Sequence, residues 1–417
     1  MKRVGSAVIM LAVCCSLGLA QTKLVLWDQY YREAESEAMN TIVARFQAEN
    51  PGIVIERTTK TLDDLKLVLK MSVESGKGPD IMQVNQGEAD MGSFVKAGLL
   101  VDLTDAAKAK KWNQSFSEGA LKSMGYRGKV YGVSTTAEIV GFYYNKAVFE
   151  KLGLKAPQTF AELEALLAKV KQAGLTPINF GNLDAWAGIH EWSGLQHVYT
   201  TRRELDDMMS DKPGKFWLAD ANVKAAEKLQ AWVKAGYYSK SFSAIGYDDS
   251  ASAFMRGDSA LMFTGNWLMG EFLKSPDLKV GFFPMPAAKS ELRKAIGGPG
   301  IPFCVSAKTK NKDAAIKFLD FLSRKDNAKL WAKLAMLPAV AVDESDVEGA
   351  DPLFKDILRA YKGAVEGNGV GYYIDWVSPT FYDTCSSSVQ KLMALEITPQ
   401  DFVKALDADY QKFVGAK

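Results

Sequence analysis

The sequence predicts an α/β protein of two lobes, each a mostly parallel sheet flanked by helices, hinged around a central cleft. The chain has 417 residues, which is more than one hydrophobic core usually covers, so two domains are expected. Strand-like apolar runs alternate with amphipathic helical segments over residues 23–84, which indicates a parallel, doubly wound sheet. A second alternating stretch, over residues 140–284, predicts the other lobe.

In the first lobe, short apolar runs predict strands at 23–27, 53–55 and 80–84. Helices are predicted at 33–50 and 62–73, because apolar residues recur there every three or four positions. The strands and helices alternate in order, so the crossovers between neighbouring strands should be right-handed.

The second lobe shows the same two periodicities. Its predicted strands are 140–144, 177–180, 260–263 and 280–284, and its predicted helices are 161–172, 185–211 and 222–235. Residues 297–300, Gly-Gly-Pro-Gly, are predicted to break the chain. The following segments are expected to be a strand at 301–305 that returns to the first lobe, helices at 312–322 and 327–334, and a mostly helical tail at 381–413.

Two such lobes define where a ligand should bind. Ligands of doubly wound sheets lie outside the carboxyl ends of the strands. Two lobes that face each other therefore form a cleft that can close around a ligand.

Residues 1–20 have the features of a secretory signal peptide. Lys2 and Arg3 precede an apolar run, and small residues lead to a cleavage site after Ala20. Cys14 and Cys15 raise the alternative of a lipoprotein, which is less favoured because the residues before them fit a lipobox poorly. We therefore expect an exported, periplasmic protein.

Composition argues against several functional classes. Of 51 Lys and Arg residues, two lie in the predicted signal peptide, and the rest equal the 49 Asp and Glu residues, so no basic field favours nucleic acid. The chain has two histidines, His190 and His197, which argues against histidine-rich zinc sites and Ser-His-Asp catalysis. Both are expected to be packing or surface residues. No cofactor is expected, and the protein is expected to be a monomer.

The predicted mature chain keeps two cysteines, Cys304 and Cys385. Export would allow them to form a disulfide. Two buried free thiols are an equally good interpretation, because the sequence does not show whether the two residues meet.

Motifs along nearly the whole chain resemble a known family. They are LVLW at 24–27, FQAENPG at 46–52, GKGPDI at 76–81, GLLVDL at 98–103, GKVYGV at 128–133, YYNK at 143–146, FEKLGL at 149–154, GNW at 265–267 and NKDAA at 311–315. Each motif is weak alone, but their number and order resemble the extracellular solute-binding proteins of ABC importers, in particular the sugar-binding group that includes maltose-binding protein.

The resemblance implies a domain organisation and a partner. An N-lobe of residues 21–133 plus 300–340 and a C-lobe of residues 134–299 plus 341–417 are expected. The protein would dock on the permease subunits of an ABC transporter when it is closed around a carbohydrate.

A sugar site needs hydrogen-bonding groups for hydroxyls and flat aromatic faces for C–H patches. Trp27, Asp28 and Gln29 follow the first strand and are candidates, with core packing for Trp27 and helix capping for the other two as alternatives. Gln83 and Asn85 follow the third strand, and their alternative is a solvated loop.

The resemblance adds candidates in the second lobe. Glu138 matches a glutamate that contacts sugar before the Tyr-Asn-Lys strand of the family. Asp184 and Trp186 match an acid and an aromatic residue spaced two apart, and Asn182 lies in the same loop after a strand. Trp267 matches a tryptophan that stacks on sugar.

Four further candidates are less specific. Asp249 belongs to an adjacent pair of acids, which are more often solvated or helix-capping. Gly298 would let the backbone approach a ligand closely or would serve as a hinge. Asp375 and Trp376 lie in a late cluster of aromatic and acidic residues, near which the family has a stacking aromatic.

The favoured function is capture of a mono- or oligosaccharide for import. A different cargo, such as a peptide, a polyamine or an iron complex, is an alternative, although no basic pocket for an anion is evident. A secreted glycoside hydrolase is a further alternative, because paired carboxylates suit that chemistry. Gln83-Val84-Asn85 replaces a tryptophan of maltose-binding protein, which argues against maltodextrin as the ligand.

Overall fold

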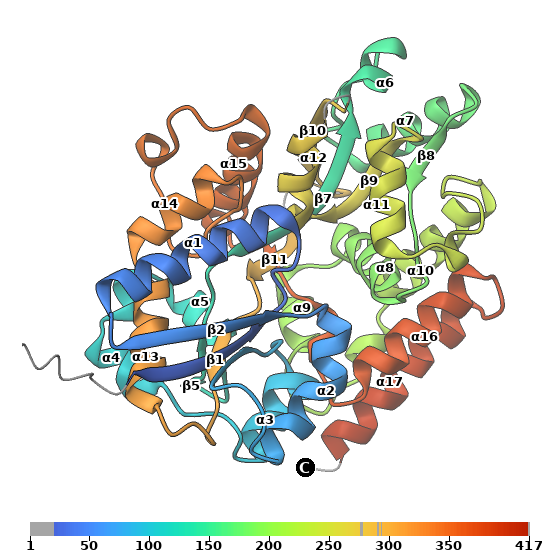
Figure 1. The fold of residues 1–417 in the computed structure, drawn as a ribbon. Helices are drawn as coiled ribbons and strands as arrows, with labels where there is room; N and C mark the ends of the chain where they lie inside the picture. Colours follow the sequence, from blue (N-terminus) through green and yellow to red (C-terminus); the bar gives the residue numbers. More distant parts are fainter. Residues whose placement is uncertain (1–20, 276–277, 290–291, 293, 416–417) are drawn as a thin grey trace, which may run out of the picture.

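The computed structural model describes residues 21–275, 278–289, 292 and 294–415. The predicted signal peptide lies outside the described residues. Figure 1 shows the first strands and helices, in blue, grouped with orange segments from after residue 300, while the green and yellow segments form the other lobe. Both lobes are therefore built from separate stretches of the chain, and the prediction of a two-lobed α/β fold is confirmed.

The first lobe is built on a five-stranded sheet in the order β2-β1-β3-β12-β6. Its strands are β1 Thr22–Asp28, β2 Ile53–Thr59, β3 Ile81–Gln83, β6 Gly132–Val133 and β12 Phe303–Val305. β1 pairs in parallel with β2 and β3, whereas β12 runs antiparallel to both of its neighbours, β3 and β6. β12 is thus the one reversed strand among the five.

The second lobe is built on a six-stranded sheet in the order β13-β11-β7-β9-β8, with β10 also beside β7. Its strands are β7 Ala137–Asn145, β8 Thr176–Asn179, β9 Ser259–Gly265, β10 Val280–Pro284, β11 Ala295–Pro299 and β13 Val370–Gly371. β7 is antiparallel to β9, β10 and β11, whereas β8 is parallel to β9 and β13 to β11. In each sheet, therefore, all strands but one run in the same direction, and the reversed strand is β12 in the first sheet and β7 in the second.

Helices cover both sheets. In the first part of the chain they are α1 Glu33–Glu49, α2 Leu62–Glu74, α3 Ser93–Lys96, α4 Thr104–Ala109 and α5 Glu118–Ser123, beside a small hairpin of β4 Gly125–Tyr126 and β5 Lys129–Val130. The middle part contributes α6 Lys146–Lys151, α7 Phe160–Gln172, α8 Trp186–Tyr199, α9 Arg202–Met208, α10 Asp220–Lys234, α11 Tyr247–Met255 and α12 Met269–Lys274. The last part contributes α13 Lys312–Leu322, α14 Lys325–Lys333, α15 Pro352–Glu366, α16 Phe381–Met393 and α17 Pro399–Gly415.

The late helices divide between the lobes. α13 packs on α1 and β1 of the first sheet, whereas α15 packs on β10 and α16 and α17 pack on α8 and α10. Among the described residues, none of the helices is both long and apolar enough to cross a bilayer.

Three segments of the chain cross between the lobes and bond to one another. The Gly300 N–H donates to the Thr136 carbonyl at 2.8 Å, and the Ala137 N–H donates to the Leu337 carbonyl at 2.7 Å. Thr136 and Pro338 also form an antiparallel bridge. These crossings lie where the predicted lobes join, but the exact lobe boundaries stay a prediction.

Two element predictions were wrong. The expected helix over 185–211 is two helices, because the Thr201 hydroxyl accepts the Glu204 N–H at 3.2 Å while the Glu204 carboxylate accepts the Thr201 N–H at 2.6 Å. This reciprocal cap starts a new helix. The expected break at 297–300 is instead mostly β11, in which a side chain on Gly297 would meet the Glu138 carbonyl at 2.3 Å.

The two cysteines are free and buried, Cys304 in β12 and Cys385 in α16. The sequence left open a disulfide or two buried free thiols, and the structure has free thiols. Burial raises the pKa of both thiols, so neither is a reactive thiolate at neutral pH.

Candidate functional site

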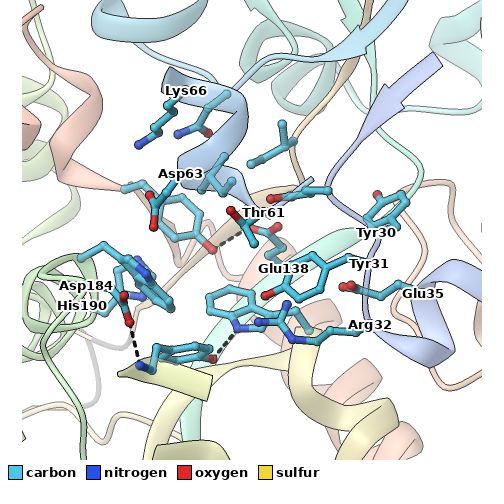
Figure 2. Close-up of a pocket in the computed structure, with 18 of the residues that line it drawn as sticks. Tyr30, Tyr31, Arg32, Glu35, Thr61, Asp63, Lys66, Glu138, Asp184 and His190 are labelled. Atoms are coloured by element: carbon cyan, nitrogen blue, oxygen red, sulfur yellow. Dashed lines mark hydrogen bonds between the residues drawn. The ribbon is translucent and has the colours of Figure 1, made fainter. Parts of the chain in front are cut away.

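A cavity of about 430 Å³ lies between the lobes, and residues of the crossing segments are part of its lining (Figure 2). This volume falls within the range of about 300–1,000 Å³ that is usual for small-molecule sites. The first lobe contributes Gln29, Tyr30, Tyr31, Arg32, Glu35, Thr61, Leu62, Asp63, Lys66, Asn85 and Gln86. The crossings and the start of β7 contribute Thr136, Ala137, Glu138, Ile301 and Met336, and the second lobe contributes Asp184, Trp186, His190, Gly246, Tyr247, Asp248, Asp249, Asn266, Trp267, Tyr373, Asp375, Trp376 and Tyr382.

The sequence-predicted residues divide into two groups. Those in the cavity lining are Gln29, Asn85, Glu138, Asp184, Trp186, Asp249, Trp267, Asp375 and Trp376. Those outside the lining are Trp27, Asp28, Gln83, Asn182 and Gly298. The second group has structural contacts that explain its position.

Asp28 is fully buried beside Arg57 of β2. Arg57 donates from Nε to Oδ2 at 2.7 Å and from Nη2 to Oδ1 at 2.8 Å, and the Tyr30 N–H also donates to Oδ1 at 2.9 Å. Asp28 therefore fixes the loop after β1 from beneath and does not face the cavity.

Gln83 and Asn182 also bond to the backbone. Gln83 accepts the Gln29 N–H at 2.8 Å and donates to the Ile301 carbonyl at 3.0 Å, which joins the first loop to a lobe crossing. Asn182 accepts the Gly188 N–H at 2.8 Å, so its amide oxygen is used within the first turn of α8. Both are positioned to hold lining residues in place.

Trp27 and Gly298 flank the cavity without lining it. Trp27 packs against the smaller hydrophobic cluster of the first lobe, with Lys60 Nζ 5.1 Å from its ring centroid. Gly298 has a φ of +141°, which favours glycine, and it pairs with Glu138 across β11 and β7. Gly298 thus supports the strand that presents Glu138.

Five rings of the second lobe form what we call the aromatic cluster: Trp186, His190, Tyr247, Trp267 and Tyr373. The Trp186 ring centroid lies 4.3 Å from that of Tyr247 and 6.1 Å from that of Trp267. His190 contacts three of these rings at centroid distances of 5.1–6.0 Å. The cluster presents apolar faces to the cavity, as a ligand with C–H patches requires.

Hydrogen bonds fix the cluster. Trp267 Nε1 donates to the Tyr247 hydroxyl at 2.6 Å, and that hydroxyl also lies 2.5 Å from Thr264 Oγ1. Burial lowers the pKa of His190 to about 4, so its ring is neutral at physiological pH. The expectation that His190 is a packing or surface residue missed its place in the cavity lining.

Carboxyl groups border the aromatic cluster. Glu138 accepts a hydrogen bond from the Tyr373 hydroxyl at 2.7 Å, and burial raises the pKa of Glu138 to about 7. Asp184 accepts the Tyr247 N–H at 2.7 Å, and Figure 2 shows Asp184 and His190 together on one side of the cavity. Burial raises the pKa of Asp375 to about 6. These groups can accept hydrogen bonds from hydroxyls.

Several lining residues were not predicted from the sequence. The segment after β1 contributes Tyr31, Arg32 and Glu35, and α2 contributes Lys66. The first three could have been expected from the sequence, because they follow a strand of the parallel sheet. Tyr247 directly precedes the acidic pair that was considered. Arg32 and Lys66 give the cavity two basic groups that were not expected from the sequence.

Contacts join the lobes on both sides of the cavity. On one side, Arg32 Nη2 lies 2.8 Å from Asp248 Oδ1, and the Tyr31 hydroxyl donates to Asp248 Oδ2 at 3.0 Å. On the other side, Lys66 Nζ lies 3.9 Å from the Tyr382 ring centroid. The structure is thus a state in which the two lobes touch around the cavity.

Two α/β lobes, three chain crossings and a cavity lined from both sides define the class of two-lobed binding proteins. Residues 41–357 match the family described as bacterial extracellular solute-binding protein. The match spans most of the sequence, and the chain belongs to this family.

Relatives and solved structures agree with this assignment. The chain is 26% identical over 327 residues to the multiple sugar-binding protein of Streptococcus mutans, covering 77% of this chain and 76% of the relative. It is 27% identical over 340 residues to a maltooligosaccharide ABC transporter solute-binding lipoprotein of Streptococcus pneumoniae, covering 77% and 74%.

A solved structure from a study of xylan utilisation by Caldanaerobius polysaccharolyticus has a TM-score of 0.82 and 26% identity, covering 93% of this chain and 99% of that chain. A chitin oligosaccharide binding protein has a TM-score of 0.83 and 23% identity, covering 95% and 99%. The fold therefore extends over nearly the whole length of both chains.

Proposed function

We propose that the protein is the substrate-binding component of an ABC importer and that its ligand is a mono- or oligosaccharide. The observation that carries the proposal is the cavity between the lobes, where the aromatic cluster lies beside several carboxyl and amide groups. This combination suits a guest with both C–H faces and hydroxyls. The sugar ligands named for its relatives support the same interpretation.

Closure of the lobes would be the event that the permease detects. A ligand in the cavity would contact Gln29 and Asn85 from the first lobe together with Trp186 and Trp267 from the second. Such a ligand binds the closed state better than the open one, because only the closed state offers both sets of contacts. The permease subunits would then dock on the closed form.

The remaining parts of the proposal concern location and chemistry. Residues 1–20 would direct export to the periplasm, and the mature protein would act as a monomer that releases its ligand unchanged. The family's extracellular description supports export. The ligand-binding residues would be the sequence-predicted ones that line the cavity, together with the other members of the aromatic cluster.

The test is a thermal-shift screen against mono-, di- and oligosaccharides, followed by calorimetry on each hit. A ligand that binds only the native state raises the melting temperature by mass action, by several degrees at about 100 times Kd. Incubation with each hit, followed by chromatography, should return it intact. Shifts with peptides alone, or cleavage of a glycoside, would contradict the proposal.

A further inference from the structure

The cavity holds far more acidic than basic side chains. Its acidic residues are Glu35, Asp63, Glu138, Asp184, Asp248, Asp249 and Asp375, and its basic residues are Arg32 and Lys66. Hydroxyls alone can bond to carboxylates, but they do not neutralise a buried negative charge. The excess of acidic side chains therefore indicates that positive charge or protonation must offset part of their negative charge.

Both basic residues are already engaged. Arg32 pairs with Asp248, and Lys66 lies against the Tyr382 ring. Figure 2 shows Lys66 and Asp63 at one end of the cavity, whereas Glu35 lies at the other end near Arg32. Lys66 is therefore too remote to compensate Glu35.

Glu35 is a cavity carboxyl group with one oxygen that has no hydrogen-bond partner among the described residues. Its side chain is 5% exposed and lines the cavity, and its Oε2 is buried without a hydrogen-bond partner. Within the described part of the chain, no salt bridge within 4.0 Å includes Glu35 or Glu138. Arg32 attracts the Glu35 carboxylate but also pairs with Asp248, so a cation bound in the cavity would stabilise the ionised form of Glu35 further.

The acidic groups around Glu35 also disfavour its ionised form. Of the charged groups that act on Glu35, Arg32 at the N-cap of α1 is cationic, while Glu138, Asp28 and Glu271 of α12 are acidic. Burial and these acids raise the pKa of Glu35 to about 8. Without a bound cation, Glu35 is therefore mostly protonated near neutral pH.

We propose that the saccharide bound in this cavity carries a basic amine, whose ammonium group lies between Glu35 and Glu138. This inference rests on the proposed function and names its substrate class. The ammonium would donate to the carboxylates of Glu35 and Glu138, while the rest of the sugar contacts the aromatic cluster. The Glu35 side chain would turn its buried Oε2 towards the ammonium. The electron-rich faces of Trp186 and Trp267 also favour a ligand with positive charge.

Binding would release protons from Glu35 and, in smaller part, from Glu138, because burial raises the pKa of Glu35 to about 8 and that of Glu138 to about 7. The ammonium keeps its own protons and stabilises the ionised form of Glu35, so the carboxyl O–H bond breaks and its proton passes to the buffer. A neutral sugar leaves Glu35 protonated. Proton release therefore distinguishes an ammonium at Glu35 from ordinary hydroxyl recognition.

The experiment compares three matched sets of ligands by calorimetry at about pH 6.5, where a sugar amine is charged. These are glucosamine, glucose and N-acetylglucosamine, with the β-1,4-linked dimer of each. We expect the amine to bind at least about tenfold more tightly than both neutral partners. We also expect its enthalpy to vary with the ionisation enthalpy of the buffer, as proton release requires.

Variants then test the assignment to Glu35. Glu35→Gln keeps the size and polarity of the side chain and should remove most of the preference for the amine. It should also lower the proton release to the share that comes from Glu138. Glu37→Gln, on the exposed side of the same helix, is the matched control and should retain both. Retention of the preference in Glu35→Gln would overturn the assignment of the ammonium site.

The outcomes also separate the two proposals. If neutral sugars bind as tightly as the amines, this inference is wrong and the proposed function stands. If short polyamines bind and no saccharide does, both proposals fail. If none of the amine-bearing saccharides binds while neutral oligosaccharides do, only the amine is excluded.

Discussion

Trp267 shows how a single residue determines the shape of the cavity. Its ring packs among those of Trp186 and His190, and its Nε1 is fixed by Tyr247. Trp267→Ala removes one indole face from the cavity, so ligand affinity should fall more than about tenfold, since buried aromatic anchors dominate binding energy.

The controls for Trp267 use calorimetry and circular dichroism together. Trp267→Phe keeps a ring but loses the Nε1 bond, so its loss of affinity should be smaller. Trp186→Ala should behave like Trp267→Ala. An unchanged Kd in either alanine variant, with the fold intact, would remove that tryptophan from the binding site.

Glu191 provides a prediction about pH and stability. It is fully buried in α8, where one oxygen accepts the Tyr238 hydroxyl at 3.0 Å and the other has no partner. Burial raises its pKa to about 8, so the folded protein holds a proton there that the unfolded chain releases above its ordinary value of 4.5. The contribution of the protonated Glu191 to the free energy of unfolding is therefore largest at low pH, and it is lost as the pH rises from about 4.5 towards 8.

Glu191→Gln should remove this dependence. Between about pH 5 and pH 8, the wild type should lose about 3 kcal/mol more unfolding free energy than the variant. Urea unfolding of both proteins at the two pH values measures the difference. Equal losses in the two proteins would show that Glu191 does not titrate in this way.

The alternation of side chains along β1 explains which site residues the sequence could locate. Asp28 lies two residues after Leu26, so it points to the same buried face, whereas Gln29 begins the loop and lines the cavity. The period of two was available in the sequence, but the partner of Asp28, Arg57 on β2, depends on strand register. Glu35 was missed because nothing local shows that its face of α1 meets the cavity.

At the scale of elements, helices with strong periodicity were predicted closely. Lys312–Leu322 agrees with its predicted bounds, and Phe160–Gln172 and Leu62–Glu74 differ from theirs by one residue. β11 was missed, because its glycines carry no apolar period and its position is set by pairing with β7 and β13. Tertiary contacts thus determine the position of β11, which the local sequence pattern did not predict.

The glycines of β11 lead to a prediction. A side chain at Gly297 would lie 2.3 Å from the Glu138 carbonyl, which is backbone and cannot rotate away. Gly297→Ala should therefore destabilise the protein by about 2 kcal/mol or more and weaken ligand binding by displacing Glu138.

Gly363→Ala is the matched control for Gly297→Ala. Gly363 lies within α15 with nothing within 4 Å of an added Cβ, so alanine should stabilise the helix by about 0.5–1 kcal/mol. Chemical unfolding of both variants measures these effects. Equal stability of the two variants would show that the close approach at Gly297 is relieved without strain.

At the scale of the whole molecule, Asp248 links the lobes through Arg32 and Tyr31. Its side chain is 60% exposed, so this ion pair should contribute less than about 1 kcal/mol. Asp248→Asn should shift the ligand-free protein towards open forms and weaken ligand binding about two- to fivefold.

Small-angle scattering and calorimetry would measure the shift at Asp248. Asp258→Asn is the control, since Asp258 pairs with Arg256 in the same lobe. An Asp248 variant with the scattering profile and Kd of the wild type would show that the pair does not influence closure.

The position of β12 has a consequence for how the protein is made. This strand fills the place between β3 and β6, but it emerges from the ribosome only after most strands of the other sheet. The sheet begun first therefore stays incomplete during much of synthesis, although N-terminal domains usually fold first. Neither half of the molecule is one uninterrupted stretch of the chain, so expressing either half alone would require a gene in which a linker joins its two stretches in place of the segment between them.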